Sequence, residues 1–278
     1  MHFQVAIDEF GTATQKAEGW TLVALPDQHA SSLVAKAPGL LGGGLTAFHG
    51  KEFTRKSEAR FREFLVLLKE SCRGEEGGLI ACTLNDEVWQ AEFTGFAERT
   101  MEGSFRGAGI VLDDAKTGML RKVVSPLFTF QRVSARLGGN HTASIVLDEG
   151  RTTKGFNEAT VDVKGVSFTL PHLAGMLYRA YRTQQFPSSP VVPRDEIRTA
   201  RDDDSFLVQA ADVVGNFSSA YLFHRLGKRT KANDLKAKIF EDVFGEFGVA
   251  SIDHQASVEI EGDDLKLKSG GGYTFVLS

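Results

Sequence analysis

The chain has 278 residues, of which 42% are hydrophobic and 24% are charged, and its formal net charge is −4. This length and composition can bury one sizeable core, so we expect a single domain over residues 1–278. The negative charge argues against a protein that coats nucleic acid by bulk attraction, which needs an excess of Lys and Arg.

The sequence also carries no targeting or disulfide pattern. The N-terminus has no basic region followed by an apolar run, and no stretch approaches the ~20 apolar residues of a membrane span. The two cysteines, Cys72 and Cys82, are too few for a disulfide framework and have no neighbouring ligands at zinc-site spacing. We therefore expect a cytoplasmic protein with inert thiols and no membrane partner.

The first half of the chain contains three apolar segments typical of buried strands, at residues 3–8, 20–25 and 79–84. Pro26 ends the second segment, and its short separation from the first predicts an antiparallel pair. Helical spacing of apolar residues predicts helices over 53–72 and 116–137, closed by Gly74 and by Gly138–Gly139.

Residues 38–50 form a glycine-rich segment that leads into the first of these helices. Gly50-Lys51 does not complete a phosphate-binding loop, because Gly44 lies six residues before Gly50 and Glu52 stands where Ser or Thr is required. A nucleotide loop is therefore excluded.

The second half repeats the pattern of the N-terminus. A strand predicted at 143–148 ends in Asp148-Glu149-Gly150, as the first strand ends in Asp8-Glu9-Phe10-Gly11. Helices are predicted over 168–182, with Pro171 in the first turn, and over 206–226, capped by Asp204 or Ser205 and ended by Gly227. A short strand around Ile197 precedes the second of these helices.

The C-terminal part adds a helix over 232–247 and alternating apolar residues between 258 and 277, with turns at 262–264 and 270–272. We expect a β-meander there. The whole pattern predicts an α/β protein, a mixed sheet flanked by helices, with a core over 3–226 and an extension over 232–278.

Four acids stand where such a fold can direct them to one point. Asp8 and Asp148 end strands, Glu52 opens a helix, and Asp212 lies in an apolar helix where an unpaired carboxylate would be costly. Carboxyl ends of strands gather at one sheet edge, and clustered carboxylates suit Mg²⁺ or Mn²⁺. Taken singly, each has another interpretation: turn residues for Asp8 and Asp148, a first-turn acid for Glu52, or a structural ion pair for Asp212.

Four motifs carry a resemblance to a known family. They are residues 7–11 (IDEFG), 48–52 (FHGKE), 146–149 (VLDE), and Asp204-Ser205 with 209–212 (QAAD), in this order over about 3–225. The chain thereby resembles the uncharacterised "domain of unknown function 3800" family. The last motif is the most specific, whereas Phe10 departs from the Ser that the family often has.

The resemblance implies a ribonuclease H-like sheet whose acids are held by a strand, a helix start, a later strand and a helix. Under it, Asp8 and Asp148 would coordinate Mg²⁺ or Mn²⁺, Glu52 and Asp212 would complete the shell, and His49 would transfer a proton or contact the phosphate. Glu149 and Asp204 are the substitutes if Glu52 does not lie with the other three acids.

Two functions follow from these patterns. The first is a metal-dependent nuclease acting on DNA or RNA, alone or with a protein partner. The alternative is a non-catalytic module that binds nucleic acid or protein through its Arg/Lys faces, which otherwise are solvated helix faces. These basic runs are Lys51, Arg55, Lys56, Arg60 and Arg62, and then His224, Arg225, Lys228, Arg229, Lys231, Lys236 and Lys238.

Overall fold

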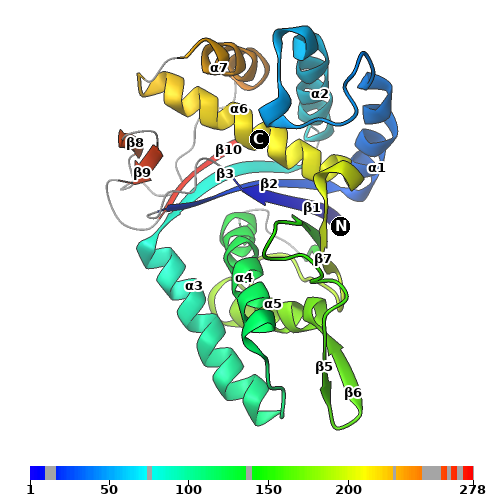
Figure 1. The fold of residues 1–278 in the computed structure, drawn as a ribbon, viewed down its shortest axis with the longest axis vertical. Helices are drawn as coiled ribbons and strands as arrows, with labels where there is room; N and C mark the ends of the chain where they lie inside the picture. Colours follow the sequence, from blue (N-terminus) through cyan, green and yellow to red (C-terminus); the bar gives the residue numbers. More distant parts are fainter. Residues whose placement is uncertain are drawn as a thin grey trace.

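A computed structural model describes residues 1–9, 17–73, 77–135, 140–227, 230–245, 258–261, 264–267 and 272–277. Six strands form one mixed sheet in the order β10-β3-β2-β1-β4-β7 (Figure 1). Their bounds are β1 His2–Glu9, β2 Ala17–Pro26, β3 Leu79–Asp86, β4 Thr142–Asp148, β7 Ile197–Ala200 and β10 Gly272–Leu277. The sheet is therefore mixed, as predicted.

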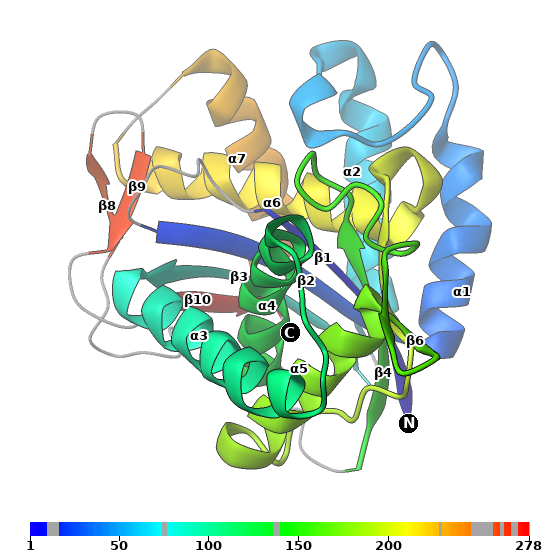
Figure 2. The same cartoon turned by 60° about the horizontal axis from the view of Figure 1, so that its bottom comes forward.

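Helices cover both faces of this sheet. One face carries α1 (Asp27–Lys36), α2 (Glu58–Ser71), α6 (Phe206–Arg225) and α7 (Lys231–Phe244). The other carries α3 (Glu87–Thr100), α4 (Asp114–Ser134) and α5 (Leu170–Gln185), which cross the near side of the sheet in Figure 2. None of the helices in the described part of the chain combines the length and the apolar run of a bilayer span.

The strand pairing explains how the sheet directs its end residues. β1 pairs antiparallel with β2 and parallel with β4, with Ile7 beside Leu147. In the order β3-β2-β1-β4-β7, three antiparallel strands are followed by two parallel ones, an arrangement compatible with the ribonuclease H-like sheet that the motifs imply. Because β1 and β4 run in the same direction, their carboxyl ends meet at one edge.

The alternation of side chains along β1 and β4 decides on which face of the sheet their last residues lie. Ile7 packs in the core under α3 to α5, whereas Ala6 and Val146 pack in the core under α6. Side chains two residues apart on a strand share a face. Asp8 and Asp148 follow Ala6 and Val146 by two residues, so both are directed to the α6 side.

Helix α6 lies unusually close to the sheet at Gly215. A Cβ atom built there would come within 2.6 Å of the Thr21 side-chain oxygen and 3.2 Å of the Glu9 carbonyl oxygen. No larger residue fits without a shift of the helix or the strand. The residues of α6 on both sides of this point, such as Val214 and Phe217, are fully buried.

The predicted strands at 3–8, 20–25, 79–84 and 143–148 and the helices at 116–137, 168–182, 206–226 and 232–247 all have counterparts within a few residues. The helix predicted over 53–72 begins only at Glu58, so Glu52 does not open it. The reason is a separate turn in which the Thr54 N–H donates to Ser57 Oγ (3.0 Å) and interrupts the segment. Glu52 instead ends a short 3₁₀ turn, Gly50–Glu52.

The predicted C-terminal meander is wrong in its third strand. β8 (Val258–Glu261) and β9 (Asp264–Leu267) form a separate hairpin, and β10 pairs antiparallel with β3. Without β10, one side of β3 would leave its backbone groups unpaired, and this edge accepts the last strand. The expected helix ends at Gly74 and at 138–139, the residues Phe10 and Gly11, and most of the turn at 270–272 lie outside the described residues.

The elements without a predicted counterpart include helices α1 and α3 and a hairpin of β5 (Thr160–Val163) and β6 (Val166–Thr169). Only two residues of α1 are buried, Ala30 and Leu33. So short an apolar pattern does not distinguish a helix from a loop.

We expect Gly215→Ala to lower the free energy of unfolding by about 1–3 kcal/mol, because the added methyl group overpacks the contact between α6 and the sheet. The matched control is Gly118→Ala in α4, where a Cβ meets nothing within 4 Å. That control should stabilise the helix by up to about 1 kcal/mol. Urea denaturation of both variants provides the measurement, and equal effects would contradict the close approach at Gly215.

Candidate functional site

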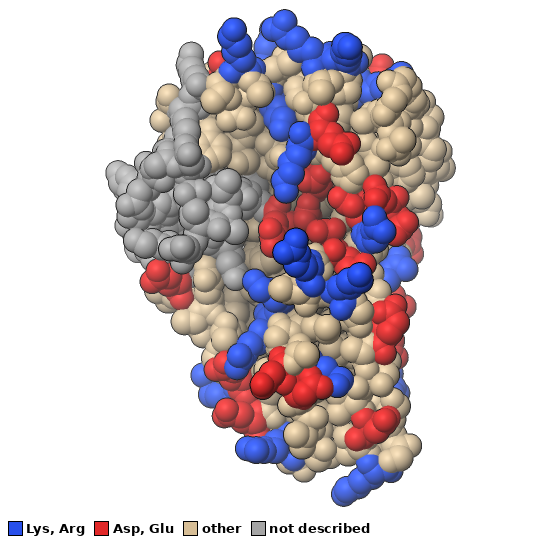
Figure 3. Space-filling view, in the orientation of Figure 1, with Lys and Arg blue, Asp and Glu red and all other residues tan. Residues whose placement is uncertain are grey.

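A pocket of about 740 Å³ opens where the carboxyl ends of β1 and β4 face helix α6. Figure 3 shows acidic side chains gathered in a hollow of this face, with Lys and Arg side chains around it. The pocket is lined by Asp8, Glu9, His49, Lys51, Glu52, Asp148, Asp202, Asp203, Asp212, Gly215, Asn216, Ser219, Ala220, Phe223, Asn233 and Lys236. All four predicted acids and His49 are therefore brought to one pocket.

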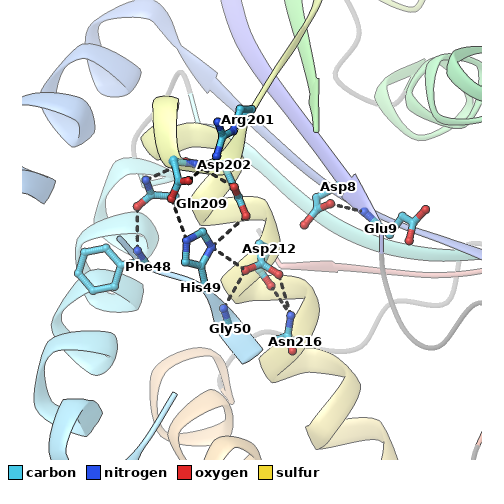
Figure 4. Close-up of polar contacts among 11 residues, drawn as sticks. Asp8, Glu9, Phe48, His49, Gly50, Arg201, Asp202, Gln209, Asp212 and Asn216 are labelled. Carbon is cyan, nitrogen blue, oxygen red and sulfur yellow. Dashed lines mark hydrogen bonds and ion pairs between the residues drawn. The ribbon is translucent and has the colours of Figure 1, made fainter. Parts of the chain in front are cut away.

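Asp212 reaches the pocket from the middle of α6, and two hydrogen bonds orient its carboxylate. The Gly50 N–H donates to Oδ2 and the Asn216 side-chain amide donates to Oδ1, both at 2.8 Å (Figure 4). Gly50 must be a glycine here, because a Cβ would lie 2.3 Å from Cβ of Asn216. Each carboxylate oxygen keeps a further lone pair for another partner.

His49 forms an ion pair with two carboxylates that the sequence did not single out. Its Nδ1 lies 2.9 Å from Asp202 Oδ2 and its Nε2 lies 3.2 Å from Asp203 Oδ1. The contact with Asp203 is a hydrogen bond and the contact with Asp202 is a close charge contact, and the two negative charges favour the imidazolium form of the ring. Burial of the ring opposes this form, but the carboxylates of Asp202 and Asp203 outweigh it and raise the pKa of His49.

Gln209 ties the two loops of the site to helix α6. Its Oε1 accepts the Phe48 N–H (2.9 Å), and its Nε2 donates to the Asp202 carbonyl oxygen (2.9 Å). Gln209 and Phe48 are both buried, so the Phe48 N–H depends on this side chain for its acceptor. The Gln of the QAAD motif thus fixes the His49 loop beside the Asp202 loop, while the Asp of the motif enters the pocket.

The strand-end carboxylates repel one another. Burial, followed by the charges of Asp212 and Asp148, raises the pKa of Asp8 well above its usual value. Burial and the charges of Asp202 and Asp212 raise the pKa of Asp148 to about 6. Burial also raises the pKa of Asp212, against the opposing effects of the Gly50 N–H, His49 and Lys51. In the described part of the chain, no Lys or Arg nitrogen lies within 4.0 Å of these three carboxylates.

One group in the described residues has the spacing of a single-ion site: ligand atoms of His49, Asp202 and Asp203 all lie within 4.8 Å of one another. In this group the two carboxylates already face two cations, because Asp203 also accepts a hydrogen bond from Arg201 at 3.0 Å. His49 must lose a proton before either ring nitrogen can bind a metal. The group is a candidate metal site, and the metal would compete there with a formed ion pair.

Other residues are placed less centrally. Glu52 is exposed where it lines the pocket, and its charge helps to raise the pKa of His49. Glu149 turns away to accept the Gly155 N–H (3.3 Å), and neither it nor Asp204 belongs to the pocket lining. The sequence analysis missed Asp202 and Asp203, although their position just after β7 is the same signal that identified Asp8 and Asp148.

No protein-family model matches the chain, and no curated protein is significantly similar to it. The fold and the site show an α/β protein with an acidic pocket that contains a candidate metal-binding cluster.

We expect Gln209→Leu to destabilise the protein by about 1–3 kcal/mol, because it leaves the Phe48 N–H without its acceptor and the Asp202 carbonyl without its donor. The control is Gln184→Leu on the exposed side of α5, which should change stability by no more than about 0.5 kcal/mol. Chemical denaturation measures both. An equally small loss in Gln209→Leu would show that the two loops do not depend on this side chain.

The raised pKa of Asp148 predicts a pH-dependent stability in metal-free buffer. The folded state holds this proton more tightly than the unfolded state, so stability falls as the pH rises from about 4 to about 6. Asp148→Asn removes this loss, and the variant should be more stable than the parent at pH 7.5, on the order of 1 kcal/mol after allowance for solvent screening. The difference should shrink towards pH 4.

Thermal unfolding of both proteins at several pH values, in the presence of a chelator, makes the comparison. The effect of His49 has the same sign, since its raised pKa also makes stability fall as the pH rises, but it is present in both proteins. A variant that is less stable than the parent at pH 7.5 would contradict the repulsion among the carboxylates.

Proposed function

We propose that this protein is a metal-dependent phosphodiesterase that cleaves nucleic acid, with a ribonuclease H-like fold. The observation that carries the proposal is the meeting of Asp8, Asp148 and Asp212 at one pocket, with raised pKa values and no Lys or Arg contact among the described residues. The order of the motifs and the compatible strand order support the fold.

The donors present fit a hard divalent cation. The three carboxylates offer only oxygen, which Mg²⁺ and Mn²⁺ prefer, and binding of a cation relieves their mutual repulsion. Gly50 and Asn216 hold Asp212 in one orientation, as the outer partners of metal ligands do. Asp8, Asp148 and Asp212 would therefore hold the ions, and Asp202, whose charge raises the pKa of Asp148, would add negative charge beside them while it stays paired with His49.

The spread of these acids favours two ions over one. Among the described residues, the ligand atoms of His49, Asp202 and Asp203 lie within 4.8 Å of one another. The carboxylate oxygens of Asp8, Asp148 and Asp212 do not form a group as compact as this. Carboxylates spread over a wider pocket can serve two ions about 3.5–4 Å apart. When bound, Mg²⁺ or Mn²⁺ activates water and stabilises the charge on the phosphodiester oxygens.

His49 serves this chemistry as a proton donor. Because Asp202 and Asp203 raise the pKa of His49, they favour its imidazolium form, which carries protons on both nitrogens. Such a group donates to a phosphate or to the leaving oxygen and does not accept a proton from water. This narrows the role that the sequence left open for His49.

The purified protein should cleave DNA or RNA only with Mg²⁺ or Mn²⁺, and Asp8→Asn and Asp212→Asn should abolish cleavage, because Asn keeps the shape but removes the charge that holds the ion. Asp114→Asn, at an exposed acid in the first turn of α4, is the control. Calorimetric Mn²⁺ titration should show binding by the parent and the control and a large loss in the two site variants.

Equal residual cleavage by all four proteins would identify a contaminating nuclease and contradict the proposal. Absence of Mn²⁺ binding in the parent would remove the metal centre itself. Nucleic-acid binding without either property would support the non-catalytic module instead.

A further inference from the structure

Lys236 is separated by the fold from the rest of its basic run. It lies on α7 one turn after Asn233, and both side chains line the acidic pocket. Lys231 and Lys238 on the same helix are exposed and do not belong to the pocket lining. Of the three lysines on α7, Lys236 therefore lies beside the carboxylates, and Lys231 and Lys238 do not.

The side chain of Lys236 is half-buried beside two aromatic rings. Its Nζ lies 5.9 Å from the ring centre of Phe53 and 5.8 Å from that of Phe217, and the two rings pack edge to face with centres 5.1 Å apart. These distances are at the outer limit of a cation–π contact. The rings therefore lie beside the apolar stem of Lys236, whose ammonium group is at the pocket.

The ammonium group has no polar partner in the described part of the chain. Among the described residues, no carboxylate oxygen lies within 4.0 Å of its Nζ, and Nζ donates no hydrogen bond to them. Asp212 is close enough to favour the charged form, although burial lowers the pKa of Lys236 overall. An ammonium group has three donors, and its partial desolvation without a protein acceptor leaves them available to an oxygen ligand in the pocket.

The charge of the pocket decides which ligand this is and when it binds. Among the described residues, seven carboxylates and three cationic side chains, Lys51, Lys236 and His49, line the pocket. An anion is repelled from such a surface until divalent cations neutralise the carboxylates. After that, an anionic oxygen can lie between the cations and Lys236.

We infer that Lys236 binds a non-bridging oxygen of the phosphodiester substrate, and does so only once the acidic pocket holds its metal ions. This inference rests on the proposed function. It assigns a substrate-binding role to a residue of α7, outside the motif-bearing core, and explains how a pocket with excess negative charge accepts a negatively charged substrate.

The test compares Lys236→Met, which keeps an apolar stem against the rings, with Lys236→Arg and with Lys238→Met as the exposed control on the same helix. The probes are Mn²⁺ alone, and then dithymidine phosphodiester and its uncharged methylphosphonate analogue in the presence of Ca²⁺. All are measured by calorimetry, with thermal unfolding to verify that each variant folds.

We expect the parent to bind the phosphodiester only with the divalent ion. Lys236→Met should weaken that binding about 10-fold or more, as for loss of a charge-assisted hydrogen bond, and Lys236→Arg should restore part of it. Lys238→Met should bind as the parent does. The methylphosphonate analogue should not distinguish the parent from Lys236→Met, and Mn²⁺ should bind Lys236→Met at least as tightly as the parent, because a positive charge near Asp212 is gone.

The two proposals fail differently. If the parent binds no Mn²⁺, the proposed function is overturned. If it binds Mn²⁺ but the phosphodiester binds equally well to Lys236→Met, or binds without any divalent ion, or does not bind the parent at all, the role of Lys236 is overturned while the metal centre stands.

Discussion

The close approach of helix α6 to the sheet is the constraint on which the site depends. Gly215 brings the helix against Thr21 and the Glu9 backbone, and Asp212 lies one turn earlier on the same helix. A second close approach, between Gly50 and Asn216, brings the His49 loop onto the next part of the same surface. Small residues at these two points allow carboxylates from a strand, a loop and a helix to share one pocket.

The acids of the pocket divide into two electrostatic groups. Asp202 and Asp203 are neutralised by His49, and Asp203 also by Arg201. Asp8, Asp148 and Asp212 face one another with little compensation, and their pKa values rise. Acidic groups whose environments differ in this way can take different roles, one group binding cations and the other keeping a proton on His49. The mutual repulsion of Asp8, Asp148 and Asp212 destabilises the metal-free fold, as expected for a site arranged to bind a cation.

The sequence predicted much of the fold because its elements are locally specified. The strands at β1 and β4 are apolar runs that end in Asp-Glu, and α6 is apolar around most of its circumference with a cap at Ser205. Prediction was weaker where local preference does not decide. The turn between Thr54 and Ser57 delays α2, and β10 adds to β3, a partner nearly 190 residues earlier in the chain that only the completed sheet offers.

For the site, the sequence by itself determined which acids stand at the ends of strands and inside an apolar helix, and the period of two along β1 and β4 directs Asp8 and Asp148 to one side. Only the tertiary structure decided which further charges join them. Asp202 and Asp203 enter because β7 pairs in parallel with β4 and ends at the same edge, whereas Glu149, next to Asp148, turns away to Gly155. Lys236 enters because α7 packs on α6 with one face towards the pocket, whereas its neighbour Lys238 remains in solvent. The physical reason is that local sequence fixes periodicity and strand ends, while the distance between two charges depends on contacts between segments far apart in the chain.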